Sequence, residues 1–399
     1  MTGPHWYSRP AARSWRTTPA RAALTSAFHS GLPGYAATPL VELPALAGEL
    51  GVGRVFVKDE SSRLGLPAFK ALGASWAIAQ ILATRANLDG PLTLDALRAA
   101  AAADPVTLIT ATDGNHGRAV ARIAALLGLP AQVFVPQVVS AGAVAAITGE
   151  GAQVTVLAGS YDAAVEQAVA AAAGHRNAVL VQDTGLAGYE QIPGWVVEGY
   201  ATLLAEIDAQ LAEAGAGPLG LIVVPVGVGS LAQAVVTHHR SAAVTAPAGP
   251  AGSSAPAGSS APAGSGAPSA PAVLGVEPDT AACVLRSLLS GAFSTIEPSA
   301  TVMVGLNCGT PSQLAWPVLQ AGLDAAVAVS DAAAEQAVTD LGSHGVSSGP
   351  CGAATLAGAR AALTGADADL RRAELGISGD SVVVLLSTEG RNSTSPPAH

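Results

Sequence analysis

The chain has 399 residues, of which 50% are hydrophobic and 4% aromatic, and its formal net charge is −10. This length predicts two domains around an interior of Ala, Val and Leu, and the acidic balance argues against nucleic acid as a partner. An uncharged stretch at 214–239 is interrupted by Pro225 and Gly227, so it predicts a strand, a turn and a helix rather than a membrane span. Three scattered cysteines, Cys283, Cys308 and Cys351, lack a CxxC spacing, which disfavours disulfides and a zinc site and favours a reducing, cytoplasmic location.

Residues 1–34 are predicted to form an N-terminal arm on the surface. The first thirty residues contain Arg9, Arg13, Arg16 and Arg21 but no acidic residue. Because organellar targeting segments have the same composition, targeting stays an alternative for this arm.

Beyond the arm, apolar runs typical of buried strands alternate with Ala-rich helical stretches. The predicted strands are 54–58, 106–111, 131–135, 153–157, 178–181, 221–226, 273–276, 326–329 and 382–386. The predicted helices are 70–86, 117–127, 161–174, 191–214, 230–239, 331–342 and 350–364. This alternation predicts an α/β fold of two lobes, each a mostly parallel open sheet flanked by helices, with a ligand in the cleft between them.

We assign a large ligand-binding domain to 35–85 and 186–399, and a small domain to 86–185. Within the large domain, residues 241–272 consist of Pro, Ala, Gly and Ser repeats. Such a segment cannot bury enough apolar area to offset its chain entropy, so it is predicted to be a disordered insertion in a surface loop.

Lys70 is the first candidate reactive residue, because the chain contains only one other lysine, Lys58. Its sequence neighbours are apolar and no acid is adjacent. Apolar surroundings lower the pKa of a lysine ammonium and supply the neutral amine that Schiff-base chemistry with a carbonyl cofactor needs. Alternatively, Lys70 is an ordinary helix residue in a lysine-poor chain.

Four glycine-containing turns follow predicted strands or enter predicted helices. They are Thr112-Asp113-Gly114-Asn115-His116-Gly117, Gly227-Val228-Gly229-Ser230-Leu231, Ser347-Ser348-Gly349-Pro350-Cys351-Gly352 and Ser387-Thr388-Glu389-Gly390. Each alone is also consistent with an ordinary helix cap or polar turn. Together with Lys70, however, they supply what pyridoxal phosphate needs: an amine, a phosphate-binding turn, an amide for the phenolic oxygen and a hydroxyl for the pyridine nitrogen.

At these residues the chain resembles the pyridoxal-phosphate lyases of the tryptophan synthase β-subunit fold (fold type II), and within them the diaminopropionate ammonia-lyases. Besides the turns, the matching segments are Leu32-Pro33-Gly34-Tyr35, Thr38-Pro39-Leu40, Val57-Lys58-Asp59-Glu60-Ser61, Ala68-Phe69-Lys70, Gln182-Asp183-Thr184, Gly275-Val276-Glu277-Pro278 and Gly305-Leu306-Asn307-Cys308-Gly309-Thr310. Asp113, where relatives acting on serine or threonine usually carry a serine, and the Asn307–Thr310 block discriminate best.

The resemblance implies a role for each of these residues. Lys70 would hold the cofactor and act as a base on one face of the substrate, and Asp113 would act on the other face, so that both enantiomers react. Asn115 would bind the phenolic oxygen, Gly227 to Leu231 the phosphate, and Ser387 or Thr388 the pyridine nitrogen. The residues implied to bind substrate are Thr112, Asp113, Gly114, His116 and Asp183.

The implied reaction is an α,β-elimination that converts 2,3-diaminopropionate to pyruvate and ammonia, carried out by a homodimer. The chain departs from the family at Gly185-Leu186-Ala187, where relatives usually have a tryptophan and a glutamate. If these positions line the pocket, the substrate differs. A serine/threonine dehydratase or β-replacement enzyme, and a cofactor-binding regulatory protein with little catalysis, therefore stay open as alternatives.

Overall fold

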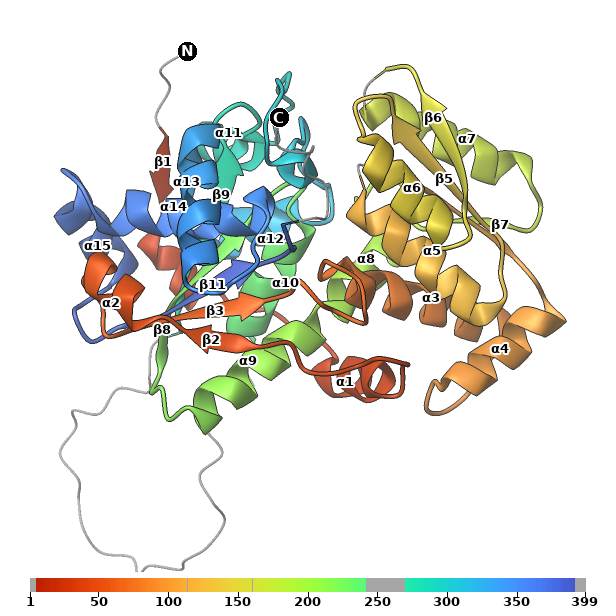
Figure 1. Ribbon diagram of the computed structural model, residues 1–399, viewed down its shortest axis with the longest axis horizontal. Coiled ribbons are helices and arrows are strands. Elements are labelled where there is room, and N and C mark those ends of the chain that lie inside the picture. Colours follow the sequence, from red (N-terminus) through yellow and green to blue (C-terminus); the bar gives the residue numbers. More distant parts are fainter. Residues whose placement is uncertain (1–4, 113, 160, 242–269, 392–399) are drawn as a thin grey trace, which may run out of the picture.

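The computed structural model of the chain describes residues 5–112, 114–159, 161–241 and 270–391. Its strands form two separate sheets, each with helices packed against it (Figure 1). The strands are β1 (Trp6–Ser8), β2 (Leu40–Glu42), β3 (Arg54–Asp59), β4 (Thr107–Ala111), β5 (Ala131–Pro136), β6 (Gln153–Leu157), β7 (Ala178–Leu180), β8 (Leu219–Pro225), β9 (Ala272–Pro278), β10 (Ala325–Val329) and β11 (Val382–Ser387).

The helices cover the faces of these sheets. They are α1 (Ala22–Ser30), α2 (Pro44–Leu50), α3 (Lys70–Ala86), α4 (Leu94–Ala103), α5 (Asn115–Leu127), α6 (Ala141–Gly149), α7 (Tyr161–Gly174), α8 (Gln191–Gly199), α9 (Ala201–Glu213), α10 (Ser230–His239), α11 (Cys283–Ser290), α12 (Trp316–Gly322), α13 (Asp331–Ser343), α14 (Pro350–Leu363) and α15 (Ala368–Leu375). Over the described residues, no helix combines the length and apolarity needed to cross a bilayer.

The larger sheet has seven strands in the order β1-β10-β9-β8-β11-β3-β2, and the smaller has four in the order β6-β5-β4-β7. All pairings in the smaller sheet are parallel, and in the larger sheet only the edge strands β1 and β2 run antiparallel. Both faces of such sheets are buried, which agrees with the continuous apolar runs of the sequence. The predicted fold class is therefore confirmed.

Among the described residues, the structure contains two edge strands and seven helices that were not predicted; the helices are α1, α2, α4, α6, α11, α12 and α15. Strands β1 and β2 were not predicted, because Trp6–Ser8 and Leu40–Glu42 each end in a polar residue and stand outside a longer apolar run, whereas the equally short β7 lies in the apolar run 178–181. β1 lies within the predicted N-terminal arm and pairs with β10. The predicted helix 191–214 is divided into α8 and α9 at Tyr200.

Helix α3, which begins at Lys70, lies unusually close to α8. A Cβ atom on Gly73 would come within 2.7 Å of Tyr200 and Val196, and one on Gly199 within 2.6 Å of the Leu72 carbonyl oxygen. Only glycine permits backbones to approach this closely. The two glycines therefore hold the start of α3 against the end of α8.

The predicted insertion at 241–272 lies mostly outside the described residues; of it, only Ser241 and 270–272 are described.

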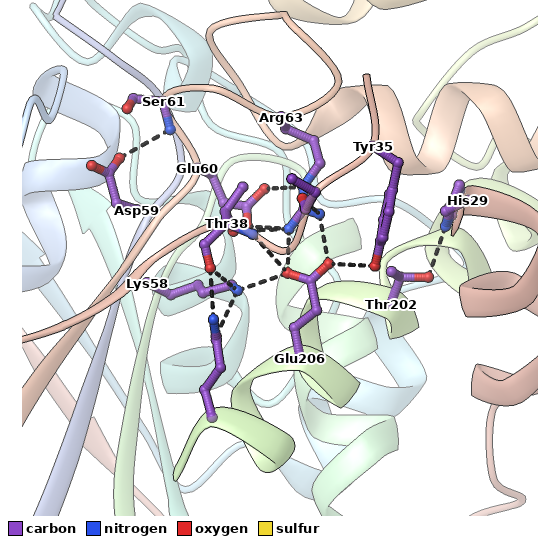
Figure 2. A network of polar contacts seen from close by, with 12 residues as sticks. His29, Tyr35, Thr38, Lys58, Asp59, Glu60, Ser61, Arg63, Thr202 and Glu206 are labelled. Atoms are coloured by element: carbon purple, nitrogen blue, oxygen red, sulfur yellow. Dashed lines mark hydrogen bonds and ion pairs between the residues drawn. The ribbon is translucent and has the colours of Figure 1, made fainter. Parts of the chain in front are cut away.

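Four charged side chains are buried together beside β3, and we call them the buried charge cluster (Figure 2): Lys58, Glu60, Arg63 and Glu206. Lys58 Nζ lies 2.7 Å from Glu206 Oε2, and Arg63 contacts Glu206 and Glu60 at 2.6 Å each. Two cations and two anions balance each other, and such pairing is what permits charges to be buried. The cluster joins β3 and the segment that follows it to α9.

The cluster also controls the ionisation of Glu206. Burial alone raises the pKa of this carboxyl, but hydrogen bonds and charge from Arg63 and Lys58 outweigh burial and lower the pKa to about 2. Because the pKa lies below its ordinary value of 4.5, this carboxylate contributes stability above that pH and loses the contribution as pH falls toward 2.

We expect Glu206→Gln to destabilise the protein by about 3–5 kcal/mol at neutral pH, because it leaves an uncompensated buried positive charge. Urea unfolding measures the free energy. Asp104→Asn is the matched control, since it breaks the exposed Arg85–Asp104 pair and should cost at most about 1 kcal/mol. The difference between wild type and Glu206→Gln should shrink as pH falls below 4.5; a constant difference would contradict the role given to this carboxylate.

Candidate active site

One cavity is lined by residues from both sheets. Its walls come from the residues that follow β4, β8 and β11 and from the starts of α3, α5 and α10. The carboxyl ends of parallel strands are the usual place for a ligand in α/β proteins. In addition, none of the described residues belongs to a group of three or more His, Cys, Asp and Glu side chains placed to hold a metal ion.

Lys70 lines this cavity as the first residue of α3. The segment before it is tied to the residues after β11, since the Phe69 amide donates to the Thr388 carbonyl at 3.2 Å and the Gly390 amide donates to the Pro67 carbonyl at 2.9 Å. The Phe69 ring also packs on Tyr200, with ring centroids 4.8 Å apart. The position of Lys70 is thus set by the larger sheet and by α8.

Asp183 is the partner of Lys70 in the cavity, with Nζ and Oδ2 2.5 Å apart. The expectation that Lys70 has only apolar surroundings is therefore wrong. An acid 113 positions away in sequence reaches it, because Asp183 lies just beyond β7 and its carbonyl accepts a hydrogen bond of 2.7 Å from Ser230 Oγ. Burial raises the pKa of Asp183, but the charge of Lys70 and the hydrogen bonds that the carboxylate accepts, acting with the other lowering effects, outweigh burial, and the net pKa falls to about 2. Asp183 is an ionised carboxylate at neutral pH.

His116 also lines the cavity and is 1% exposed. Its Nε2 lies 2.8 Å from the Val181 carbonyl oxygen, and its Nδ1 lies 3.8 Å from Asp183 Oδ2. Burial lowers the pKa of His116, and the positive charge of Lys70 lowers it further, against the opposing effect of Asp183. The imidazole is therefore neutral near pH 7.

Asn115 faces the cavity from the start of α5, and its amide is held by Glu389. Asn115 Nδ2 donates to Glu389 Oε2 at 2.7 Å, while Glu389 Oε1 accepts from the Cys351 amide at the start of α14 at 3.3 Å. The anionic acceptor fixes the NH₂ group of Asn115 on this side of the side chain. The bond also connects the smaller sheet, through α5, to the larger sheet, through β11.

The turn from Gly227 to Leu231 lines the cavity at the start of α10. Gly229 has φ +102°, a left-handed conformation, and a Cβ there would lie 2.7 Å from Leu319. A Cβ on Gly227 would lie 3.1 Å from the Gly305 carbonyl oxygen. No side chain therefore covers the backbone of these two glycines at the start of a helix, where unpaired N–H groups and the helix dipole favour an anion.

The two hydroxyls at the end of β11 lie in different surroundings. Thr388 lines the cavity, whereas Ser387 is completely buried and donates from Oγ to Ser348 Oγ at 2.8 Å. Ser387 is not one of the described residues that line the cavity.

The cavity brings together most of the residues singled out in the sequence. Lys70, Thr112, Asn115, His116, Asp183, the turn Gly227–Leu231 and Thr388 all line it. Gly114 is not among the described lining residues; its amide donates to Thr112 Oγ1 at 2.9 Å and so shapes the loop. Asp113 lies outside the described residues.

The segment 185–187, where the chain departs from the family pattern, is likewise not among the described residues that line the cavity. Gly185 lies against Leu314 and Ser312 instead, and its amide donates to Ser312 Oγ at 2.9 Å.

Sequence reasoning missed several lining residues. Glu389 belongs to a turn that was recognised, and its position two residues after Ser387 was the signal available. Phe69, Tyr161 and Tyr200 also line the cavity, but nothing in the sequence distinguishes them from core aromatic residues.

Comparison with known proteins places this site in a family. The model of the family described as pyridoxal-phosphate dependent enzyme matches residues 32–388. The diaminopropionate ammonia-lyase of Escherichia coli (strain K12) is 34% identical over 377 residues, which cover 93% of this chain and 88% of the relative.

Solved structures agree with the sequence relatives. The crystal structure of diaminopropionate ammonia lyase from Escherichia coli in complex with D-serine has a TM-score of 0.84 at 32% identity, covering 97% of this chain and 94% of that one. The same enzyme in complex with an aminoacrylate-PLP azomethine reaction intermediate has a TM-score of 0.82 at 31% identity, with the same coverage. The chain therefore belongs to the pyridoxal-phosphate-dependent enzymes and, within them, to the diaminopropionate ammonia-lyases.

Proposed function

We propose that the chain catalyses the elimination of ammonia from 2,3-diaminopropionate. With one water molecule, the complete reaction yields pyruvate and two molecules of ammonia. The observation that carries this proposal is that Lys70, Asp183, Asn115 and the bare glycine turn line one cavity in a chain of this family.

The residues of the cavity fit pyridoxal phosphate. Lys70 would hold it covalently through the ε-amine, the turn from Gly227 to Leu231 would bind its phosphate, and Asn115 would bind its phenolic oxygen. The glycine positions support this assignment, because a side chain at Gly229 would collide with Leu319 and displace the backbone that faces the phosphate. When bound, pyridoxal phosphate acts as an electron sink and stabilises negative charge at the substrate α-carbon.

The proton transfers fall to residues of the chain itself. Lys70 is the proposed base on one face of the substrate and Asp113 on the other. The role proposed for Asp113 is supported by its sequence position between Thr112, which lines the cavity, and Gly114. Each positioned acid or base contributes roughly 10²–10⁴ in rate. Asp183 would pair with the β-ammonium. A neutral hydroxyl near the ring nitrogen would suit elimination, and Thr388, which lines the cavity, is the better candidate than Ser387, whose hydroxyl donates to Ser348.

We also infer that the chain acts in the cytoplasm as a homodimer, with a large domain at 35–85 and 186–399 and a small domain at 86–185. The scattered cysteines support the compartment, and the family resemblance supports the dimer. The two separate sheets support the division into domains.

Purified protein supplied with pyridoxal phosphate should release pyruvate from 2,3-diaminopropionate faster than from serine or threonine. The Asp183 carboxyl group in the cavity favours a substrate with a second ammonium group. A coupled pyruvate assay over an amino-acid panel measures this preference. Absence of pyruvate from both enantiomers of 2,3-diaminopropionate would refute the proposal.

Lys70→Ala should abolish the visible absorbance of the bound cofactor, because it removes the attachment point. Lys58→Met is the matched control, since Lys58 is the only other lysine and its amine is committed to Glu206. We expect this variant to be less stable yet to keep the absorbance. If Lys70→Ala kept the absorbance and Lys58→Met lost it, the assignment would be reversed.

Asp113→Asn should slow one enantiomer of 2,3-diaminopropionate by about 10²-fold or more while affecting the other far less, because only one face loses its base. Separate kcat measurements on the D and L forms test this. Equal losses for both forms would remove the stereochemical role of Asp113.

A further inference from the structure

The imidazole of His116 has an acceptor with no protein partner. Its Nε2 contacts the Val181 carbonyl oxygen, which only accepts hydrogen bonds, so Nε2 carries the proton and Nδ1 carries a lone pair. Nδ1 is completely buried and has no hydrogen-bond partner within the described parts of the chain. Because buried polar atoms are nearly always paired, such an atom in a ligand cavity indicates a contact made by the ligand.

Nδ1 and the Asp183 carboxylate face the same point. The nearer carboxylate oxygen, Oδ2, is 3.8 Å from Nδ1, and two acceptors cannot bond to one another. A group that donates at least two hydrogen bonds from one atom would satisfy both. Lys70 shows that a primary ammonium approaches this carboxylate, since its Nζ is 2.5 Å from the same oxygen.

Lys70 does not fill this role in the working enzyme under the proposed function, on which the inference rests. There its amine is committed to the cofactor, and the carboxylate and the imidazole are left facing the cavity. The imidazole stays neutral and continues to accept, because burial opposes its protonation.

We propose that His116 Nδ1 and Asp183 together form the site for the β-ammonium group of a diamino acid, and that His116 makes this site selective for an ammonium over a hydroxyl. A primary ammonium has three donors and no lone pair, so it can bond to both acceptors at once. A hydroxyl has a single donor and satisfies only one of them. Serine would therefore leave either Nδ1 or the carboxylate without a partner.

Two substitutions separate this role from the structural role of His116. His116→Gln keeps an N–H donor at the ε position for the Val181 carbonyl but removes the acceptor at the δ position. His116→Asn does the reverse, since its carboxamide oxygen can accept near the δ position while the ε donor is lost. His29→Gln is the matched control. His29 is also buried, but it bonds Thr202 (Figure 2) and the Leu72 carbonyl, and it is not among the described residues that line the cavity.

The experiment uses the holoenzymes and measures dissociation constants for 2,3-diaminopropionate and serine from the change in cofactor absorbance, together with KM for pyruvate release. For His116→Gln we expect the affinity for 2,3-diaminopropionate to fall roughly ten- to hundredfold, the value of a hydrogen bond to a charged group, with little change for serine. His116→Asn should keep the preference for 2,3-diaminopropionate, and His29→Gln should leave both affinities unchanged. Melting temperature and cofactor absorbance confirm that each variant is folded and loaded.

Equal losses for both ligands in His116→Gln, or no loss, would overturn the proposal, as would a lost preference in His116→Asn but not in His116→Gln. These results differ from a failure of the proposed function. In that case the wild-type protein itself neither binds 2,3-diaminopropionate nor releases pyruvate from it, and the proposed ligand of His116 falls with the function.

Discussion

The ion pair between Lys70 and Asp183 is the contact around which the cavity is organised. It joins the start of α3 to the segment after β7, so that residues 113 positions apart meet in the cleft between two sheets. Each partner is held separately: Lys70 by the residues next to β11 and by α8, and Asp183 by the hydroxyl of Ser230 at the start of α10. The surrounding framework therefore keeps the amine, the carboxylate and the glycine turn together in the cavity, even when the amine leaves the carboxylate for the cofactor as proposed above.

The two lysines of the chain show how environment decides the role of a residue. Lys58 is completely buried in the buried charge cluster, where its amine donates to Glu206, to Gln210 and to the Thr38 carbonyl. Lys70 is partly exposed, with 19% of its side chain accessible, and it points into the cavity. The cluster binds the segment that follows β3 to α9, and that segment leads directly to Lys70. Lys58 thus stabilises the framework that holds Lys70 in the cavity.

The sequence predicted much of this arrangement, for identifiable reasons. The nine predicted strands were found because each lies in an apolar run, which for most of them reflects burial on both faces, whereas β1 and β2 each end in a polar residue outside such a run. Lys70, Asn115 and the Gly227 turn were found because each lies at a junction between elements. The contact between Asp183 and Lys70, and that between Glu389 and Asn115, depend on how the two sheets pack together. No local pattern encodes those contacts, so the surroundings of Lys70 were predicted incorrectly.

The hydrogen bond from Asn115 to Glu389 couples the position of the two sheets to the orientation of a side chain in the cavity. It spans the boundary between the sheets and ends on the same amide that is proposed to hold the cofactor's phenolic oxygen. If the lobes separated at this point, the bond would break and the Asn115 amide would lose the acceptor that orients it. The strength of cofactor binding and the relative orientation of the lobes are therefore coupled. We expect the cofactor to bind more weakly when the lobes are apart.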